Sequence, residues 1–205
     1  MPNNYPSWYR RRGYLHFDLP LGFKKAKAVA TNPKHVESHS FYPFINYTIT
    51  AEKIAKDPGT LKLINVQKSR PIAYAAHIDS HIYAYYSKII SKSYELELNK
   101  RGLNDAVLAF RSLGKSNIDF ASEAFSQICA YGSCGVVGLD VTGFFDNLDH
   151  SILKDKWSYL LGDSRLPNDH FSVFKSLTRW SSVDRTSLYQ LFGISKNNPK
   201  NDRYR

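Results

Sequence analysis

Residues 135–153, GVVGLDVTGFFDNLDHSIL, carry the strongest structural signal in the chain. Together with the residue before them they contain the most apolar run, Cys134–Val141, which predicts a buried central strand. Asp140 stands at the end of that run, where an ionised carboxylate is costly unless it is paired or bound to a metal ion. An aspartate that caps the turn after the strand is the alternative. The polar and aromatic residues that follow predict a tight turn directly over the carboxylate.

The composition indicates a globular and basic protein. Of the 205 residues, 42% are hydrophobic and 14% are aromatic, which is typical of a chain with a packed core. The chain has 28 Lys and Arg against 18 Asp and Glu, a formal charge of +10, so we expect an anionic partner, with nucleic acid favoured over a membrane surface. The sequence has no apolar run of membrane-span length, no signal-peptide core and only two cysteines, which together predict a cytoplasmic protein.

The segments before the central strand predict a basic hairpin and a long helix. A helix is expected to begin at Thr50. The runs 61–66 and 71–75 then predict two short strands around a basic hairpin tip at Gln67–Arg70. Apolar residues recur at helical spacing from about residue 76 to residue 98, which predicts a helix of several turns.

Two histidines, His77 and His81, lie one turn apart on this long helix. Zinc sites use such spacing, but the sequence offers no third ligand in view, so both are interpreted as surface or helix-packing residues. The remaining predicted elements are a strand at 106–110 and helices at 117–128, 151–161 and 168–180.

Residues 135–153 resemble motif A of reverse transcriptases, the palm segment whose aspartate and following carbonyl hold the catalytic divalent ions. Two flanking segments agree in order and spacing. Residues 70–72 (RPI), ahead of the long helix, resemble the first fingers motif, and residues 109–111 (AFR) resemble the second. The resemblance is to bacterial retron-like and group II intron-like enzymes, and most closely to the defence-associated, abortive-infection type. It covers roughly residues 62–191.

The resemblance implies roles for several residues. Asp140 would be the catalytic carboxylate, and with the carbonyl of Val141 it would bind Mg²⁺, or Mn²⁺ in its place. Phe145 matches the aromatic position that packs under the sugar and excludes a 2′-hydroxyl; a core phenylalanine is the alternative. The triphosphate of the incoming nucleotide would be clamped by Arg70, Arg111 and Lys115. For Arg70, a solvated charge at the hairpin tip is the alternative.

The first 32 residues or so mix basic and aromatic side chains with little periodicity. Two interpretations carry equal weight: an arm wrapped on the domain by its aromatic residues, or an arm that contacts a nucleic-acid backbone. The second interpretation, extended to the hairpin, assigns nucleic-acid contacts to Arg10, Arg11, Arg12, Lys24, Lys25 and Lys68.

The predicted fold class is α+β, with the fingers and a partial palm of a right-hand polymerase. The expected divisions are a basic aromatic arm with the start of the fingers (1–60), the fingers (61–132), the partial palm (133–195) and a polar basic tail (196–205). A complete enzyme also needs motif B and a Tyr-x-Asp-Asp hairpin, and this sequence contains no Asp-Asp pair. Because one carboxylate cannot hold two Mg²⁺ ions, we expect a chain truncated before motif B and inactive alone.

The expected function is RNA-directed DNA synthesis by two-metal nucleotidyl transfer, in a bacterial antiphage defence system. The implied partners are an RNA template, the DNA product and deoxynucleoside triphosphates, with no membrane. A structured non-coding RNA and a second chain that completes the palm are further candidates. The alternatives are a non-catalytic module that binds RNA or an RNA–DNA hybrid, and an assembly subunit whose exposed half-palm packs on another chain.

Overall fold

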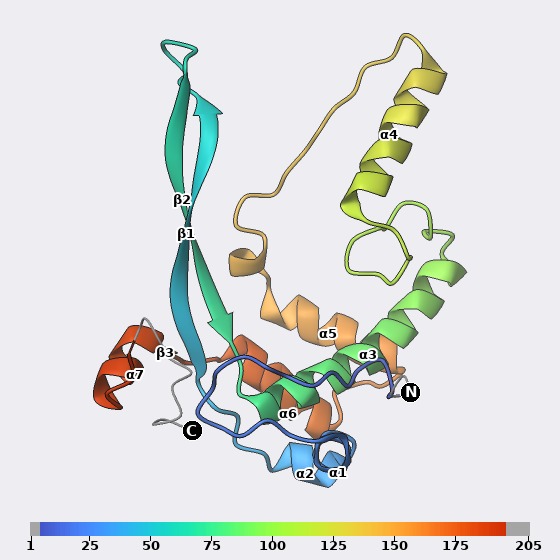
Figure 1. Cartoon of the computed structure of the whole chain (residues 1–205). Helices are drawn as coiled ribbons and strands as arrows, with labels where there is room; N and C mark the ends of the chain where they lie inside the picture. Colours follow the sequence, from blue (N-terminus) through green and yellow to red (C-terminus); the bar gives the residue numbers. More distant parts are fainter. Residues whose placement is uncertain (1–4, 196–205) are drawn as a thin grey trace. The chain divides into compact units, whose positions relative to one another are not determined.

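The computed structural model describes residues 5–195 and has an α+β fold (Figure 1). Among these residues there are seven α-helices and one three-stranded mixed sheet. The chain forms two compact units: residues up to Lys88 together with those from Pro167 onward, and Ile89–Leu166. The predicted α+β class is confirmed. The polymerase-like divisions stay predictions, and the predicted tail at 196–205 lies outside the described residues.

The sheet of the first unit is a long two-stranded ribbon with a short third strand at its base (Figure 1). β1 (Phe44–Lys56) and β2 (Leu63–Tyr74) are antiparallel, and twelve consecutive residue pairs join them. β3 (Ser182–Asp184) pairs in parallel with the first residues of β1, so the strand order is β2-β1-β3.

Two predictions for this region are wrong. Thr50 does not begin a helix, because it lies in the middle of β1. Gln67–Arg70 is not a hairpin tip but the middle of β2, and the turn lies at residues 57–62. There the Asp57 carboxylate accepts a hydrogen bond of 2.6 Å from the amide of Thr60, as aspartates do in tight turns. This turn chemistry and the continuous cross-strand pairing outweigh the local helix signal.

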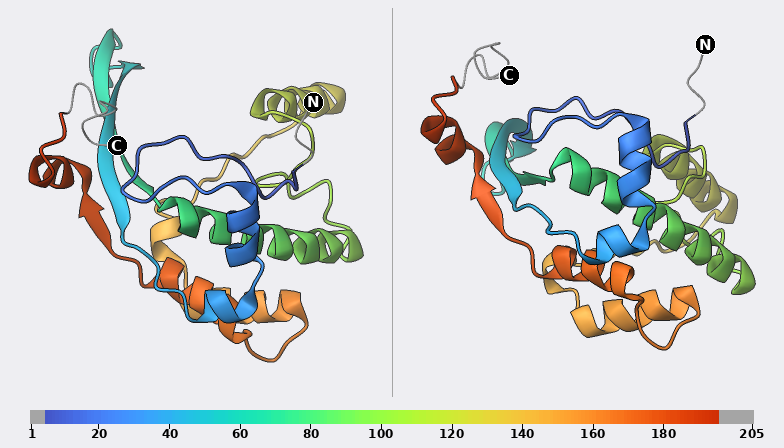
Figure 2. Two further views of the ribbon diagram at one scale, coloured as in Figure 1. Left: turned by 60° about the horizontal axis from the view of Figure 1, so that its bottom comes forward. Right: turned by 90° about the horizontal axis from the view of Figure 1, so that it is seen from below.

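Five helices lie wholly or partly in the part of the first unit that the structure describes. They are α1 (Phe23–Ala30), α2 (Pro33–Glu37), the first half of α3 (His77–Lys100), α6 (Asn168–Thr178) and α7 (Arg185–Leu191). The buried apolar side chains of this unit include Ala26, Ala30, Val36, Ile82, Tyr86, Val173 and Phe174. In both views of Figure 2 the N-terminal arm, in dark blue, runs beside the first half of α3. Within residues 5–195, no helix has the length and apolar character needed to cross a bilayer.

The second unit contains the rest of α3, α4 (Asn117–Tyr131), the single 3₁₀ turn η1 (Phe145–Asn147) and α5 (His150–Leu161). The predicted long helix and the three helices after it are therefore confirmed, with ends shifted by a few residues. α4 begins with a capping box, in which Ser116 and Asp119 each bond the other's backbone amide.

The two strands predicted in the second unit are wrong. Residues 106–110 form turns, and residues 134–141 are extended but irregular and exposed. Val137 is 82% exposed and Leu139 is 92% exposed. A strand needs neighbouring backbone to satisfy its amides and carbonyls, and no segment among the described residues pairs with 134–141. The apolar run lacks the sheet that would bury it.

Candidate functional site

The loop after Asp140 is a tight turn fixed by one glycine. Gly143 has a φ of +62°, and its carbonyl accepts hydrogen bonds from the backbone amides of Asp146 and Asn147, both at 3.1 Å. The Asn147 side-chain amide donates to the same carbonyl at 2.9 Å. A Cβ added at Gly143 would lie 2.9 Å from that amide nitrogen, so a larger residue would push the Asn147 side chain aside and would also be strained at this φ. The predicted turn after the apolar run is therefore present, although the run itself is not a strand.

Asp140 lines an open hollow of about 560 Å³ on this loop, together with Val141, Phe144, Phe145 and Asp146. The side chain of Asp140 is exposed, not buried as the sequence predicted, because the strand that would bury it does not form. Within residues 5–195 the Asp140 carboxylate has no hydrogen-bond or ion-pair partner. An exposed, unpaired carboxylate beside a backbone carbonyl offers the oxygen ligands that hard divalent cations prefer.

Phe145 stands at the rim of this hollow and is 69% exposed, so it is not a core residue. Its ring centroid lies 5.3 Å from that of Phe144 and 6.3 Å from that of Phe110, with the Phe110 ring nearly perpendicular at 83°. Phe110 is held at a φ of +58°, which is uncommon for a bulky residue. The structure thus places a residue of the segment 135–153 and a residue of the segment 109–111 side by side.

Arg111 is occupied by contacts within the second unit. Its guanidinium donates to both carboxylate oxygens of Glu95, with the shortest distance at 2.7 Å, and to the carbonyls of Asn104 and Val107, both at 2.7 Å. A further bond goes to the Asn104 side-chain oxygen at 3.1 Å. These bonds engage all three guanidinium nitrogens and join the loop at 104–111 to α3. A role in clamping triphosphate would require Arg111 to give some of them up.

Lys115 also has a partner within this unit. Its Nζ lies 2.6 Å from Oε1 of Glu123 and 5.9 Å from the ring centroid of Phe120. Both charges of the pair are about half exposed, so the pair is weakly held and Lys115 is free to exchange partners at little cost.

Arg70 and Lys68 lie on the β1–β2 ribbon of the first unit. Directly opposite residues share a face, and Ile49 faces Arg70, Ala51 faces Lys68 and Lys53 faces Val66. Three exposed cations, Lys53, Lys68 and Arg70, therefore occupy three successive pairs of one face, which we call the basic face. Successive pairs are about 7 Å apart.

The opposite face of the ribbon is nearly neutral over the same length. Its pairs are Thr50 with Ser69, Glu52 with Gln67 and Ile54 with Asn65. The ribbon thus has two chemically different sides, and only the basic face suits a run of phosphates. Arg70 is part of this face rather than a charge at the hairpin tip.

The N-terminal arm is wrapped on its unit by aromatic contacts. The ring of Tyr9 packs against those of Tyr5 and Phe23 at centroid distances of 5.1 Å in each case, and Trp8 meets Tyr85 of α3 at 5.4 Å. This supports the first of the two interpretations of the arm. The cations predicted to contact nucleic acid differ in setting: Arg12 donates to the Ser80 carbonyl, whereas Arg10, Arg11, Lys24 and Lys25 are exposed.

A buried polar cluster at the start of α3 was not predicted from the sequence. His77, Asp79 and His81 are each no more than 1% exposed. Asp79 lies 2.6 Å from Nε2 of His39 and accepts a 2.8 Å bond from the Tyr42 amide. These contacts hold the segment before β1 against α3.

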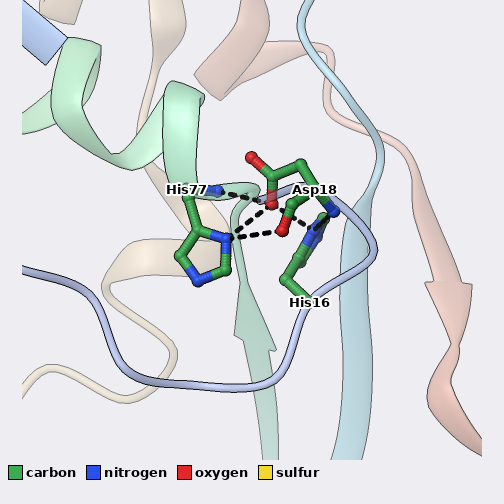
Figure 3. Close-up of side chains that lie close together, drawn as sticks. All are labelled: His16, Asp18 and His77. Carbon is green, nitrogen blue, oxygen red and sulfur yellow. Dashed lines mark hydrogen bonds and ion pairs between the residues drawn. The ribbon is translucent and has the colours of Figure 1, made fainter. Parts of the chain in front are cut away.

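The same turn of α3 holds the N-terminal arm through Asp18. The Asp18 carboxylate accepts hydrogen bonds from the amides of His77 at 3.0 Å and Ile78 at 3.1 Å, and lies against the rings of His16 and His77 (Figure 3). Burial raises the pKa of Asp18, but the bonds from His77 and Ile78 outweigh it and leave the pKa below its ordinary value. Burial lowers the pKa of His16. The one sequence signal for this cluster was the His77/His81 spacing.

No model of a known protein family matches the chain, and no curated protein matches it.

Proposed function

We propose that the chain is the fingers and first palm portion of an RNA-directed DNA polymerase, a bacterial reverse transcriptase of the defence-associated type. One observation carries the proposal: an unpaired Asp140 stands at an open hollow beside Phe145, whose ring meets Phe110. The resemblance assigns metal binding to Asp140 and sugar selection to Phe145. Phe110 lies in the segment that resembles the second fingers motif. Its contact with Phe145 was not part of the sequence pattern that suggested the family.

Asp140 and the carbonyl of Val141 would be the metal ligands of this chain. They fit Mg²⁺, because both are hard oxygen donors and the carboxylate has no competing partner in the part of the chain that the structure describes. Bound Mg²⁺ would lower the pKa of the primer 3′-hydroxyl and neutralise the leaving pyrophosphate in an in-line transfer. Two ions need more carboxylates than Asp140 supplies, so a Tyr-x-Asp-Asp hairpin in further sequence or in a second chain would complete the site.

Phe145 would select the sugar of the incoming nucleotide. Its ring is already exposed on the hollow that Asp140 lines, and Gly143 fixes the turn that presents it. A 2′-hydroxyl would meet this ring, whereas a deoxyribose would not. The RNA template, the antiphage setting and the cytoplasmic location belong to the same proposal and are supported by the family resemblance.

The test is Mg²⁺-dependent incorporation of deoxynucleotides on a primed RNA template, comparing the 205-residue chain with the longest product of its reading frame. We expect incorporation by the longer protein, abolished by Asp140→Asn and largely kept by Asp146→Asn, which alters a carboxylate on the same hollow. Phe145→Ala should raise the use of ribonucleotides relative to deoxynucleotides. Absence of incorporation by both proteins would contradict the proposal.

A second candidate function, binding of RNA or an RNA–DNA hybrid without chemistry, is favoured by the basic face of the ribbon. Its cations are exposed and evenly spaced, as contacts to successive phosphates would require. Binding through this face should weaken steeply with salt, and neutralising Lys68 and Arg70 together should reduce the slope of log affinity against log salt by about 1 to 2. Glu52→Gln on the opposite face is the matched control and should not reduce that slope. Salt-independent binding would exclude this function.

A further inference from the structure

Two imidazoles converge on one carboxylate oxygen where the N-terminal arm meets α3 (Figure 3). Nδ1 of His16 and Nδ1 of His77 each lie 2.7 Å from Oδ1 of Asp18. The side chains of His16 and His77 are 5% and 1% exposed, and that of Asp18 is 16% exposed. All three atoms lie within 4.8 Å of one another, so a single ion could contact all of them.

The hydrogen bonds of His77 leave its Nδ1 turned toward oxygen atoms. Its Nε2 lies 3.1 Å from the carbonyl of Tyr14, to which it can donate. Its Nδ1 faces two oxygens of Asp18, the carboxylate Oδ1 at 2.7 Å and the backbone carbonyl at 3.0 Å. Without a metal ion, a hydrogen on Nδ1 joins the ring to Asp18, and a bound cation would take the place of that hydrogen. Metal-ligating histidines are commonly oriented by such a bond from the other ring nitrogen.

His16 also directs its Nδ1 at Asp18. This nitrogen lies 3.2 Å from the Asp18 amide and 2.7 Å from Oδ1, and Nε2 of His16 is buried with no hydrogen-bond partner among the described residues. A divalent cation between the three atoms would take the place of the hydrogens that otherwise join the two rings to the carboxylate.

We propose that His16, Asp18 and His77 bind a transition-metal ion of the zinc class, which fastens the N-terminal arm to α3. Two imidazole nitrogens and one carboxylate oxygen suit Zn²⁺, and Mg²⁺ and Ca²⁺ prefer oxygen ligands alone. Ligands at the usual bond lengths of tetrahedral zinc stand about 3.3 Å apart, so each imidazole would move away from Asp18 by about 0.6 Å. The amides of His77 and Ile78 already hold the carboxylate in place. This site is separate from the Asp140 hollow and does not depend on polymerase activity.

The experiment measures zinc binding by the full 205-residue chain after chelator treatment, with Zn²⁺ alone as the probe. Cys129 and Cys134 are exposed thiols that would compete for zinc, so the starting protein carries Cys129→Ser and Cys134→Ser. We expect one zinc ion per chain by titration calorimetry at pH 7.5. His16→Gln and Asp18→Asn should each weaken binding by at least about tenfold.

Three further readouts separate the site from adventitious binding. Substitution of the exposed His150 by glutamine should leave the zinc affinity unchanged. Zinc should raise the thermal midpoint of the starting protein but not that of His16→Gln. Binding should weaken between pH 7.5 and pH 5.5, because protons compete for the imidazoles.

Two results would overturn the proposal. One is the absence of zinc binding at micromolar free metal, and the other is a folded His16→Gln protein that binds zinc as tightly as the starting protein. Where circular dichroism shows that a variant has not folded, the visible absorption spectrum of Co²⁺ bound to the starting protein tests the site instead. Visible absorption bands of mixed nitrogen and oxygen ligation support the site, and their absence rejects it.

Discussion

Replacement of His81 by phenylalanine should remove much of the acid sensitivity of this protein. His81 is 1% exposed, and neither of its ring nitrogens has a hydrogen-bond partner within residues 5–195. Its ring stacks on that of Tyr9, with centroids 5.2 Å apart and planes 15° apart. Burial, helped by the charge of Arg12, lowers the pKa of His81 from 6.5 to about 4. Phenylalanine keeps a ring of similar size for the stack but cannot take up a proton.

The size of the effect follows from the two pKa values. Between pH 6.5 and pH 4 the unfolded chain binds a proton at His81 and the folded chain does not, so the free energy of unfolding falls as the pH falls. The full difference corresponds to about 3 kcal/mol, and titration between pH 7 and pH 5 accounts for about 2 kcal/mol of it. Carboxylates whose pKa is lowered by folding, such as Asp18, stabilise the folded protein while they are ionised. They lose this stabilisation below pH 4, outside the range from pH 7 to pH 5.

The assay is urea unfolding at pH 7 and pH 5, with a chelator present so that no metal contributes. From pH 7 to pH 5 the free energy of unfolding of the unmodified protein should fall by about 2 kcal/mol more than that of His81→Phe. His150→Gln removes an exposed histidine and should behave like the unmodified protein. Equal losses in the unmodified protein and in His81→Phe would refute the assignment of a neutral, buried His81.

Substitutions in the core, in the loop at 104–111 and in the motif A turn have equally definite expected outcomes. Tyr86→Phe removes the 2.6 Å hydrogen bond that the hydroxyl donates to the carboxylate of Asp169 in α6. It should lower the free energy of unfolding, measured with urea, by about 1 to 2 kcal/mol. Arg111→Lys should lower the thermal midpoint more than Arg101→Lys, because the Arg111 side chain is 5% exposed against 57% and lysine cannot reproduce its bonds. Gly143→Ala should speed hydrogen exchange across the turn that follows Asp140, whereas Gly138→Ala, which meets no neighbour, should not.

Four of the seven helices among the described residues were predicted from the sequence because their signals are local, whereas the short helices α1, α2 and α7 were not. Apolar residues at helical spacing identified α3, and the segments of α4, α5 and α6 were found with small errors at their ends. The strands were not predictable in the same way. The run at 134–141 has the composition of a buried strand, but a strand also requires partners, and the described residues supply none. Conversely, the residues around Thr50 look helical in isolation and pair as a strand because β2 lies alongside.

The two candidate sites also differ in how close together their residues lie in the sequence. The hollow at Asp140 is made by residues within one short segment, so its members could be named from the sequence, although its exposure could not. The cluster at His77 joins residues 59 positions apart. The partners of His77 in this cluster, His16 and Asp18, come from the N-terminal arm, and neither periodicity nor motif spacing indicates that contact. His81 itself faces Tyr9 rather than the other histidines.

The strand register of the ribbon limits which insertions and deletions keep the three cations on one face. Loss of a single codon between Arg70 and the base of the ribbon would turn Lys68 and Arg70 to the side of Glu52, away from Lys53, because side chains alternate at every residue. Loss of two codons would shorten the ribbon and keep the three cations together. Insertions and deletions within β1 and β2 should therefore preserve the basic face only when they come in even numbers.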